Sequence, residues 1–307
     1  MEATQKLKKL LKTPDVIITT GAYDALSAKV IEQAGIPLII TTGFGISASR
    51  IGRPDAELYT MTENLETVKN MTQAVDIPVI ADLDTGYGNA LNVIRTVREF
   101  ERAGCAGGIL EDQLSPKRCP ACVDSFELVP VPEALGKIRA ALEARKDPDF
   151  LIIARTDARG REAVGRAYAY LEAGANLVLF ISKAFSSFRE MEKQTRSLPG
   201  SFCLNYFEKI HYPNWSRGNW TLRDLNRLGV KFLNFPLLPL FAATQALKGV
   251  AEYLGRHHGV RGLKLPKRMD PGRFSELIGF PQLSALQKKY LPSPDEVFGR
   301  KSFKNKS

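Results

Sequence analysis

The chain has 307 residues, of which 44% are apolar and 25% are charged. This length allows one large domain or two small ones, and the composition excludes a wholly disordered chain. No apolar run approaches the roughly 18 residues that would indicate a membrane span. We therefore expect a folded chain with no membrane partner.

The formal net charge of +10 raises the question of nucleic-acid binding. Residues 245–307 contain 13 basic and 5 acidic residues, whereas residues 1–244 contain 30 and 28. The basic excess is therefore concentrated in the C-terminal fifth, and most of the chain is nearly neutral. Nucleic-acid binding would rest on charge alone, and we expect no nucleic-acid partner.

The four cysteines, Cys105, Cys119, Cys122 and Cys203, are too few to form a disulfide framework in a chain of this length. Cys119 and Cys122 form a C-x-x-C, but neither a second pair nor a nearby His completes a zinc site. The pair lies in a predicted loop rather than at the start of a helix. We expect a reduced, cytoplasmic compartment.

Short β-branched runs alternate with amphipathic stretches along the chain. The predicted strands are Val16–Thr20, Leu38–Thr42, Val79–Asp82, Gly108–Asp112, Leu151–Arg155, Asn176–Ile181, Phe202–Tyr206 and Lys231–Phe235. The predicted helices between them are Ala25–Ala34, Thr62–Ala74, Leu91–Ala103, Pro132–Ala144, Arg161–Ala173 and Thr221–Leu228. This rhythm predicts an α/β fold, a (β/α)₈ TIM barrel. A doubly wound sheet is the alternative, but no G-x-G-x-x-G follows the first strand.

We assign residues 1–244 to the barrel and residues 245–307 to a C-terminal helical arm and basic tail of the same structural domain. A helix is predicted over Phe241–Tyr253, and shorter helices over Asp270–Ile278 and Gln282–Lys289. We expect the basic residues Arg300–Ser307 to be loosely held.

Acidic side chains follow two neighbouring predicted strands, at the end of a barrel where active sites form. Asp82 and Asp84 are two residues apart, so both can face the same side of a strand end. With Glu111 from the next strand they would form an oxygen-only cluster, which suits Mg²⁺, with Mn²⁺ as a second option. The alternative is that these acids cap strand ends and pair with Arg155.

Arg155 ends another strand and predicts a bidentate clamp for a substrate carboxylate or phosphate. It could instead neutralise Glu111 or Asp157. The backbone N–H groups of Thr42, Gly43 and Phe44 could bind an anion, although glycine after a strand more often marks a turn.

Six motifs lie in order along the chain: Gly21–Ala28, Gly52–Asp55, Ala81–Asn89, Leu110–Gln113, Pro116–Cys119 and Asp149–Ala158. Together they resemble the isocitrate lyase/phosphoenolpyruvate mutase superfamily. The resemblance covers roughly residues 5–255, in order and at matching spacings. The nearest branch is that of the short 2-methylisocitrate lyases, dimethylmalate lyases and oxaloacetate acetylhydrolases.

The resemblance implies a barrel whose last helix is exchanged between subunits, giving a homotetramer or a dimer. It also implies Mg²⁺ at Asp82, Asp84 and Glu111, with Asp55 nearby, and a small carboxylic acid as substrate. In the family, a bond next to a 2-oxo acid is cleaved or formed through a metal-bound enolate. The remaining family positions are Arg155 for charge stabilisation, Thr42–Phe44 for the substrate carboxylate, and Asn205 and Glu208 in an Asn-x-x-Glu pattern.

In the lyases of the family, a lid cysteine protonates the enolate carbon. Cys119 has that position here, and the neighbouring Lys117 and Arg118 would favour its thiolate. The Gly and His that follow in the family are Pro120 and Ala121. The family's acid at the end of strand six falls on Ile181 or Ser182.

The half of the site that receives the second product therefore departs from the family pattern. Leu238 replaces a small hydroxyl residue after strand eight. The aromatic segment 207–220 suggests a larger or less acidic substrate, or alternatively the core of a lengthened loop.

The predicted function is a Mg²⁺-dependent carbon–carbon lyase acting on a substituted malate or 2-methylisocitrate-like 2-hydroxy acid. Cys119 would reprotonate the enolate, and Tyr23 would be a base or positioning group. Alternatives are an oxaloacetate-type hydrolase, or a diverged member that condenses, cyclises or only binds a 2-oxo acid. A phosphonomutase is disfavoured, because its Lys-x-x-x-x-Asn-Ser lid is not found at residues 117–125.

Overall fold

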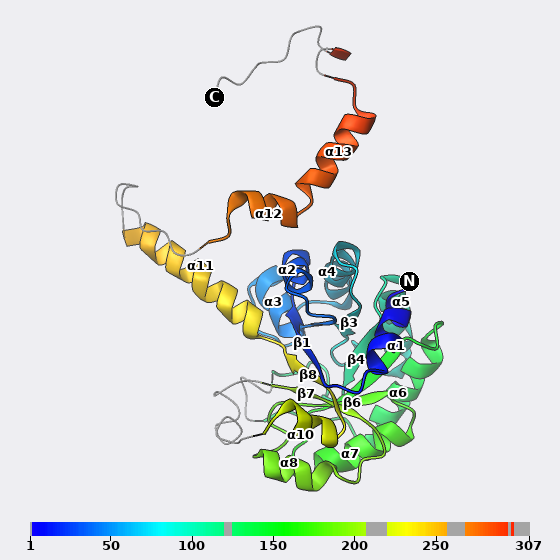
Figure 1. Ribbon diagram of the computed structural model, residues 1–307. Coiled ribbons are helices and arrows are strands. Elements are labelled where there is room, and N and C mark those ends of the chain that lie inside the picture. The colour runs from blue at the N-terminus through cyan, green and yellow to red at the C-terminus, as the bar shows by residue number, and fades with distance from the viewer. Residues whose placement is uncertain (1, 120–124, 207–219, 257–267, 294–295, 298–307) are drawn as a thin grey trace. The chain divides into compact units, whose positions relative to one another are not determined.

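The computed structural model describes residues 2–119, 125–206, 220–256, 268–293 and 296–297 (Figure 1). The chain divides into two compact units, Met1–Lys248 and Gly249–Ser307, which are described separately. No helix in the described part of the chain is long and apolar enough to cross a membrane.

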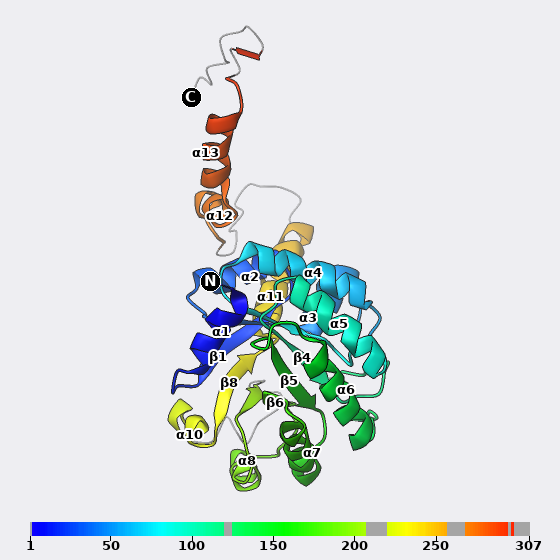
Figure 2. The same cartoon turned by 90° about the vertical axis from the view of Figure 1, so that its right-hand side faces the viewer.

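Eight parallel strands form a closed barrel in sequence order, which confirms the predicted TIM-barrel fold (Figures 1 and 2). β8 pairs with β1, with Phe232 opposite Ile17 and Phe235 opposite Thr20, so the last strand closes the barrel against the first. The strands are β1 (Ile17–Ala22), β2 (Ile39–Thr41), β3 (Val79–Asp82), β4 (Gly107–Glu111), β5 (Leu151–Thr156), β6 (Leu177–Phe180), β7 (Phe202–Asn205) and β8 (Val230–Phe235).

Helices connect the strands and cover the outside of the barrel (Figure 2). In the first unit they are α1 (Ala3–Leu11), α2 (Ala25–Gln33), α3 (Gly43–Ile51), α4 (Met61–Ala74), α5 (Ala90–Arg102), α6 (Val131–Ala144), α7 (Gly160–Glu172), α8 (Phe188–Thr195) and α10 (Leu222–Arg227). The helix α11 (Leu238–Arg256) crosses the boundary between the units, and α12 (Pro271–Leu277) and α13 (Phe280–Tyr290) lie in the second unit.

Three helices of the first unit, α1, α3 and α8, lie where no helix was predicted. The helix α3 matters most for the site, because it begins immediately after β2 within a glycine-rich stretch that the sequence favoured as a turn. The Thr42 side chain accepts a hydrogen bond from the Gly45 N–H at 3.3 Å and caps this helix. Gly52, in the left-handed conformation, ends it.

The barrel interior is filled by apolar side chains from successive strands. Ile40, Ile80, Ile109, Ile153 and Leu179 are each at most 3% exposed and belong to one apolar cluster. Leu7 of α1 belongs to the same cluster and is buried. Because this packed layer fills the barrel interior, polar chemistry is restricted to the ends of the strands.

Candidate active site

A pocket lies where seven of the strands end. It brings together side chains that the sequence placed after separate strands, as a barrel does with its carboxyl-terminal strand ends. Its walls are Ile40, Thr41, Thr42, Phe44, Asp55, Asp82, Ile109, Cys119, Arg155, Leu179, Ile181, Ser182, Asn205, Asn234, Pro236 and Leu237.

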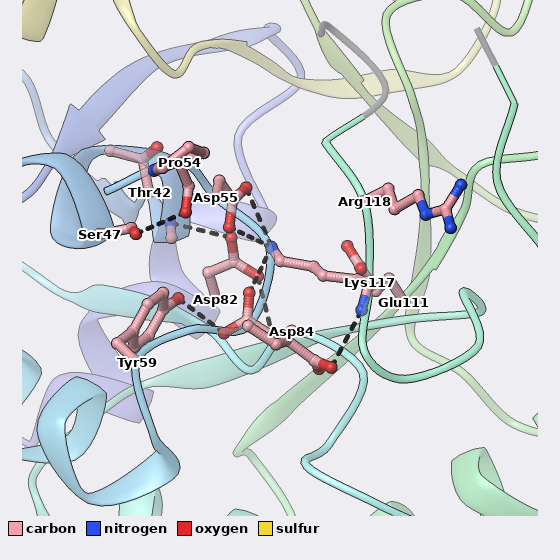
Figure 3. Close-up of polar contacts among 12 residues, drawn as sticks. Thr42, Ser47, Pro54, Asp55, Tyr59, Asp82, Asp84, Glu111, Lys117 and Arg118 are labelled. Atoms are coloured by element: carbon pink, nitrogen blue, oxygen red, sulfur yellow. Dashed lines mark hydrogen bonds and ion pairs between the residues drawn. The ribbon is translucent and has the colours of Figure 1, made fainter. Parts of the chain in front are cut away.

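Carboxylates from three segments converge beside this pocket, with the Lys117 ammonium among them (Figure 3). Lys117 Nζ lies 2.5 Å from Asp84 Oδ1 and 3.0 Å from Asp55 Oδ1. Its side chain is 2% exposed, and those of Asp84 and Asp55 are 0% and 9% exposed. The sequence located Lys117 beside the candidate cysteine but did not place its charge in the acidic cluster.

Asp84 joins the cluster through a tight turn after β3. The strand ends at Asp82, and Asp84 and Tyr87 both have positive φ, at 49° and 60°. The hydroxyls of Tyr59 and Tyr87 donate to Asp84 Oδ2 at 2.6 and 2.7 Å. The expectation that Asp82 and Asp84 share a face of one strand therefore had the wrong cause: the turn, rather than the strand, directs Asp84.

Asp82 is held by backbone donors. The Gly43 N–H donates to Asp82 Oδ2 at 3.1 Å, and the Asp84 N–H donates to Asp82 Oδ1 at 3.2 Å. Gly43 was expected to offer its N–H to a substrate anion, but here this group bonds to Asp82. The start of α3 thus stabilises one of the predicted metal ligands.

Arg155 links the cluster to a second buried acid. Its guanidinium lies 2.7 Å from Glu111 Oε2 and donates to both oxygens of Asp157, at 2.8 and 2.9 Å. The alternative role weighed for Arg155 is therefore observed, because its guanidinium neutralises Glu111 and Asp157. The side chain also lines the pocket, where a substrate clamp would lie. Arg155 is buried and fixed, as a clamp for an anionic substrate requires.

Burial shifts the pKa of the acidic side chains in different directions. Burial raises the pKa of Asp55, Asp82 and Glu111. Burial alone would also raise the pKa of Asp84, but the Lys117 ammonium and the tyrosine hydroxyls hold it below its ordinary value. Burial alone would lower the pKa of Lys117, whereas Asp55 and Asp84 raise it well above its usual value. Asp84 and Lys117 therefore form the charged pair at the centre of the cluster.

The segment that carries Cys119 is tied to the barrel by two side chains. Glu57 Oε2 accepts hydrogen bonds from the Ser115 hydroxyl at 2.6 Å and from the Lys117 N–H at 3.0 Å. The Gln113 side chain accepts from the Arg118 N–H at 2.8 Å and donates to Asp157. The sequence gave no signal for the role of Glu57, because one acid in a loop has no periodic pattern.

The donor set fits a hard divalent cation. Among the described residues, no three His, Cys, Asp or Glu side chains are already grouped as a metal site. However, Asp55 Oδ1 and Asp84 Oδ1 are buried beside the Lys117 ammonium, and the buried Glu111 Oε1 accepts no hydrogen bond. Such oxygens are the ligands that Mg²⁺ prefers, and the ammonium now beside two of them shows that the cluster accepts a cation.

The other predicted site residues are distributed unevenly around the pocket. Thr42, Phe44 and Asn205 line it, and Asn234 donates to the Asn205 side chain at 2.8 Å. Tyr23 is half-buried and is not among the lining residues. Glu208, with most of the aromatic segment, and Pro120 and Ala121 lie outside the described residues.

The wall away from the acidic cluster is neutral. Ile181 and Ser182, the positions that replace the family's acid after strand six, both line the pocket. Leu237 also lines it, whereas Leu238 is 52% exposed. The part of the pocket without carboxylates is thus built from apolar and uncharged polar side chains.

Comparisons with known proteins agree with this architecture. Residues 7–254 match the family model described as phosphoenolpyruvate phosphomutase. The chain is 37% identical to 2,3-dimethylmalate lyase of Eubacterium barkeri, over 94% of this chain and 99% of that protein. The structure of phosphonopyruvate hydrolase in complex with oxalate and Mg²⁺ matches with a TM-score of 0.82 and 33% identity, covering 95% of this chain and 100% of that one.

The structure of a second hydrolase also matches. The structure of oxaloacetate acetylhydrolase in complex with its product oxalate matches with a TM-score of 0.81 and 31% identity, covering 94% of this chain and 98% of that one. Relatives of this fold thus include a lyase and hydrolases, and two of the solved structures hold a small dicarboxylate.

Proposed function

We propose that this chain, which belongs to the phosphoenolpyruvate mutase/isocitrate lyase superfamily, cleaves a carbon–carbon bond of a substituted malate-type 2-hydroxy acid. The cleavage would depend on Mg²⁺. The observation that carries the proposal is the single pocket that joins Asp55, Asp82, Arg155 and Cys119. The similarity to 2,3-dimethylmalate lyase supports cleavage over the other reactions of the superfamily.

In the proposed reaction, the chain binds the substrate carboxylate and controls two protons. Arg155 attracts the carboxylate, and Thr42 and Phe44 shape the wall beside it. Loss of the C2 hydroxyl proton to a base makes C2 a carbonyl carbon, and the C2–C3 bond breaks. The electron pair then remains on C3, which takes a proton from the Cys119 thiol. Tyr23 remains a candidate base or positioning group.

Asp82, Asp84 and Glu111, with Asp55 nearby, would hold the Mg²⁺. The bound ion would stabilise negative charge that develops on substrate oxygens. Mn²⁺ takes similar oxygen ligands and is the second candidate. Asp84 is suited to this role because its pKa is held below its ordinary value, so the carboxylate stays ionised.

The neutral wall favours a substrate with an alkyl-substituted carbon over a tricarboxylate. Ile181 and Ser182 line the pocket at the positions where the family has an acid, and Leu179 and Leu237 add apolar surface. A second candidate is hydrolysis of an oxaloacetate-type 2-oxo diacid, which the similarity to oxaloacetate acetylhydrolase supports. The two reactions release different products, which allows them to be distinguished.

The test is a panel of substituted malates, 2-methylisocitrate and oxaloacetate incubated with the full chain and Mg²⁺. Release of pyruvate or another 2-oxo acid from a malate would support cleavage, and release of oxalate would support hydrolysis. Cys119→Ser should lose turnover by about 100-fold or more yet bind Mg²⁺ normally, because it removes a proton donor outside the ligand set. Cys122→Ser is the matched control. The proposal fails if no acid in the panel is consumed and no Mg²⁺ binds.

We also propose that the chain assembles as a homotetramer or dimer through its C-terminal helices. Neither α12 nor α13 has a buried residue within the single chain. Both expose large apolar side chains, which in water favour contact with another surface. These residues are Phe274, Ile278, Phe280, Leu283, Leu286 and Tyr290.

A further inference from the structure

The side chain of Gln113 bridges the acid that holds Arg155 and the segment that carries Cys119. Its amide N–H donates to Asp157, and its Oε1 accepts from the Arg118 N–H at 2.8 Å. We propose that Gln113 is a positioning residue that fixes the Cys119 thiol relative to the Arg155 guanidinium. This inference rests on the proposed function, because it takes Cys119 as the proton donor.

The backbone of Gln113 is held in place beside the barrel. Gln113 follows the end of β4 by two residues and is 1% exposed. It forms a β-bridge with Leu128, and the neighbouring Leu114 N–H donates to the Glu127 carbonyl at 2.9 Å. These contacts join the chain before Cys119 to the chain that returns after it. The Gln113 amide therefore extends from a fixed base.

The carboxylate that Gln113 contacts is also fixed by other bonds. Asp157 is 0% exposed, and its two oxygens accept from the Arg155 guanidinium at 2.8 and 2.9 Å. Its own N–H donates to Asp112 Oδ1 at 3.0 Å. Arg155 and Gln113 thus share one buried anchor. Since Arg155 and Cys119 both line the pocket, a bond from this anchor to the cysteine segment relates their positions.

The two partners of Gln113 require opposite hydrogen-bonding groups. The Asp157 carboxylate, paired with Arg155, accepts, whereas the Arg118 N–H donates. A carboxamide supplies a donor and an acceptor on one side chain, so both bonds can form together. A carboxylate of the same length would offer only acceptors and would place a second negative charge beside Asp157. An apolar side chain would offer neither group.

The bond from Gln113 acts close to the cysteine. It holds the N–H of Arg118, one residue before Cys119, whereas Glu57 holds the Ser115 hydroxyl and the Lys117 N–H farther back. Without this bond, the backbone next to Cys119 can shift while Lys117 stays in place. A displacement of about 1 Å between reacting atoms can lower a rate by about 100-fold, so the proton donor depends on such anchoring.

Cysteine alkylation of the full chain tests the positioning without a substrate. In Gln113→Met, iodoacetamide should modify Cys119 faster than in the wild type, by about fivefold or more, because the segment opens more often. Gln113→Glu is the second variant and should change the rate in the same direction, since like charges oppose the bond to Asp157. Peptide mass spectrometry in a Cys122→Ser background measures the rate at one thiol.

The matched control is Gln194→Met on helix α8. Gln194 also donates to a carboxylate, Glu190 at 2.9 Å, but it does not line the pocket. The same change of side chain there should leave the alkylation rate of Cys119 within about twofold of the wild-type rate, because local opening of one segment need not affect another.

Steady-state kinetics on a substrate from the panel separate positioning from a general loss of structure. Gln113→Met should lower kcat by about tenfold or more and leave KM within about threefold, because Arg155 keeps its bonds to Asp157. Mg²⁺ affinity should also stay within about threefold, since Gln113 is not a proposed ligand. A purely structural role would reduce the folded fraction and leave kcat per folded molecule unchanged.

The outcomes separate this inference from the proposed function. If the wild type cleaves an acid but both Gln113 variants keep the wild-type alkylation rate, the positioning role is wrong and the proposed function stands. An unchanged kcat in folded Gln113→Met leads to the same conclusion. If the wild type consumes no acid and binds no Mg²⁺, the proposed function is wrong, and the alkylation rates still decide whether Gln113 holds the Cys119 segment.

Discussion

Gly43 shows how little space separates the start of helix α3 from the carboxylate cluster. A Cβ atom at this position would lie 2.7 Å from the Tyr59 hydroxyl, 2.9 Å from Asp84 Oδ1 and 3.1 Å from Asp82 Oδ2. All three atoms belong to the hydrogen-bonded network that sets the cluster. Glycine is therefore required here by close approach rather than by its backbone angles.

We predict that Gly43→Ala weakens Mg²⁺ binding by tenfold or more and destabilises the fold by about 1–3 kcal/mol, because overpacking must displace a carboxylate or Tyr59. Calorimetric titration and urea unfolding measure the two effects. Gly136→Ala is the control, since nothing lies within 4 Å of its Cβ position in helix α6. That change should stabilise the fold by about 0.5–1 kcal/mol. Wild-type metal affinity in Gly43→Ala would contradict the argument.

Arg155 is the second residue whose removal should affect both stability and chemistry. Arg155→Gln leaves the buried Glu111 and Asp157 carboxylates without their cation. We expect a loss of about 3–5 kcal/mol in the free energy of unfolding, as for other broken buried ion pairs. Arg155→Lys, which retains the charge without the planar fork, should lose less stability but still lose turnover. Equal stability of the two variants in urea would refute this prediction.

At the scale of an element, helix α4 begins with a reciprocal cap that depends on an ionised carboxylate. Glu63 Oε2 accepts from the Thr60 N–H at 2.7 Å and from the Thr60 hydroxyl at 2.9 Å, while the Thr60 hydroxyl accepts from the Glu63 N–H. Hydrogen bonding to the Thr60 backbone lowers the pKa of Glu63 from its ordinary value of 4.5. A lowered pKa in the folded state means that the folded form binds this proton less readily than the unfolded form.

The stabilisation from Glu63 is therefore present above pH 4.5 and disappears as the pH falls through the lower pKa of the folded state. We predict that Glu63→Gln lowers the melting temperature slightly at pH 7 and that this difference shrinks toward zero as the medium becomes more acidic than pH 4. Thermal unfolding of both proteins between pH 3 and pH 7 measures this difference in melting temperature. A difference in melting temperature that grows on acidification would contradict this prediction.

Secondary-structure elements with a periodic residue pattern could be predicted from the sequence, whereas isolated side-chain contacts could not. The alternation of β-branched runs and amphipathic stretches predicted all eight strands within two residues at each end. It missed helix α3, because glycines at 43 and 45 are poor helix formers and a side-chain cap from Thr42 decides the outcome. Tertiary contacts override propensity at such positions.

The candidate site shows the same difference between what a sequence pattern predicts and what single contacts decide. Acids at strand ends could be predicted to converge, because a barrel brings these ends together. Glu57 and Lys117 could not be placed, since each enters the site from a loop whose path is set by contacts distant in sequence. The prediction of the ligand set from Asp82, Asp84 and Glu111 still awaits a metal measurement.

At the scale of the whole molecule, the C-terminal helices carry the prediction of assembly. Leu283 and Leu286 on α13 are 49% and 53% exposed within the single chain. We predict that the double change Leu283→Glu and Leu286→Glu shifts the chain to a smaller assembly at micromolar concentration, because charged residues oppose burial in an interface. Light scattering after size exclusion reports the mass.

The control for assembly is Leu91→Glu on α5 of the barrel, a leucine that is 75% exposed. It adds one such negative charge to a surface outside the C-terminal unit and should leave the mass unchanged. A monomeric wild type, or an unchanged mass in the double variant, would contradict the proposed assembly.

The pairing of β8 with β1 has a consequence for the chain while it is being synthesised. Both edges of the sheet stay open until residues 230–235 have left the ribosome, although β1 is complete after residue 22. During that interval the hydrogen-bonding groups on the open edge of the first strand face solvent or a chaperone. Protection of the nascent chain therefore matters most late in translation, shortly before the eighth strand closes the ring.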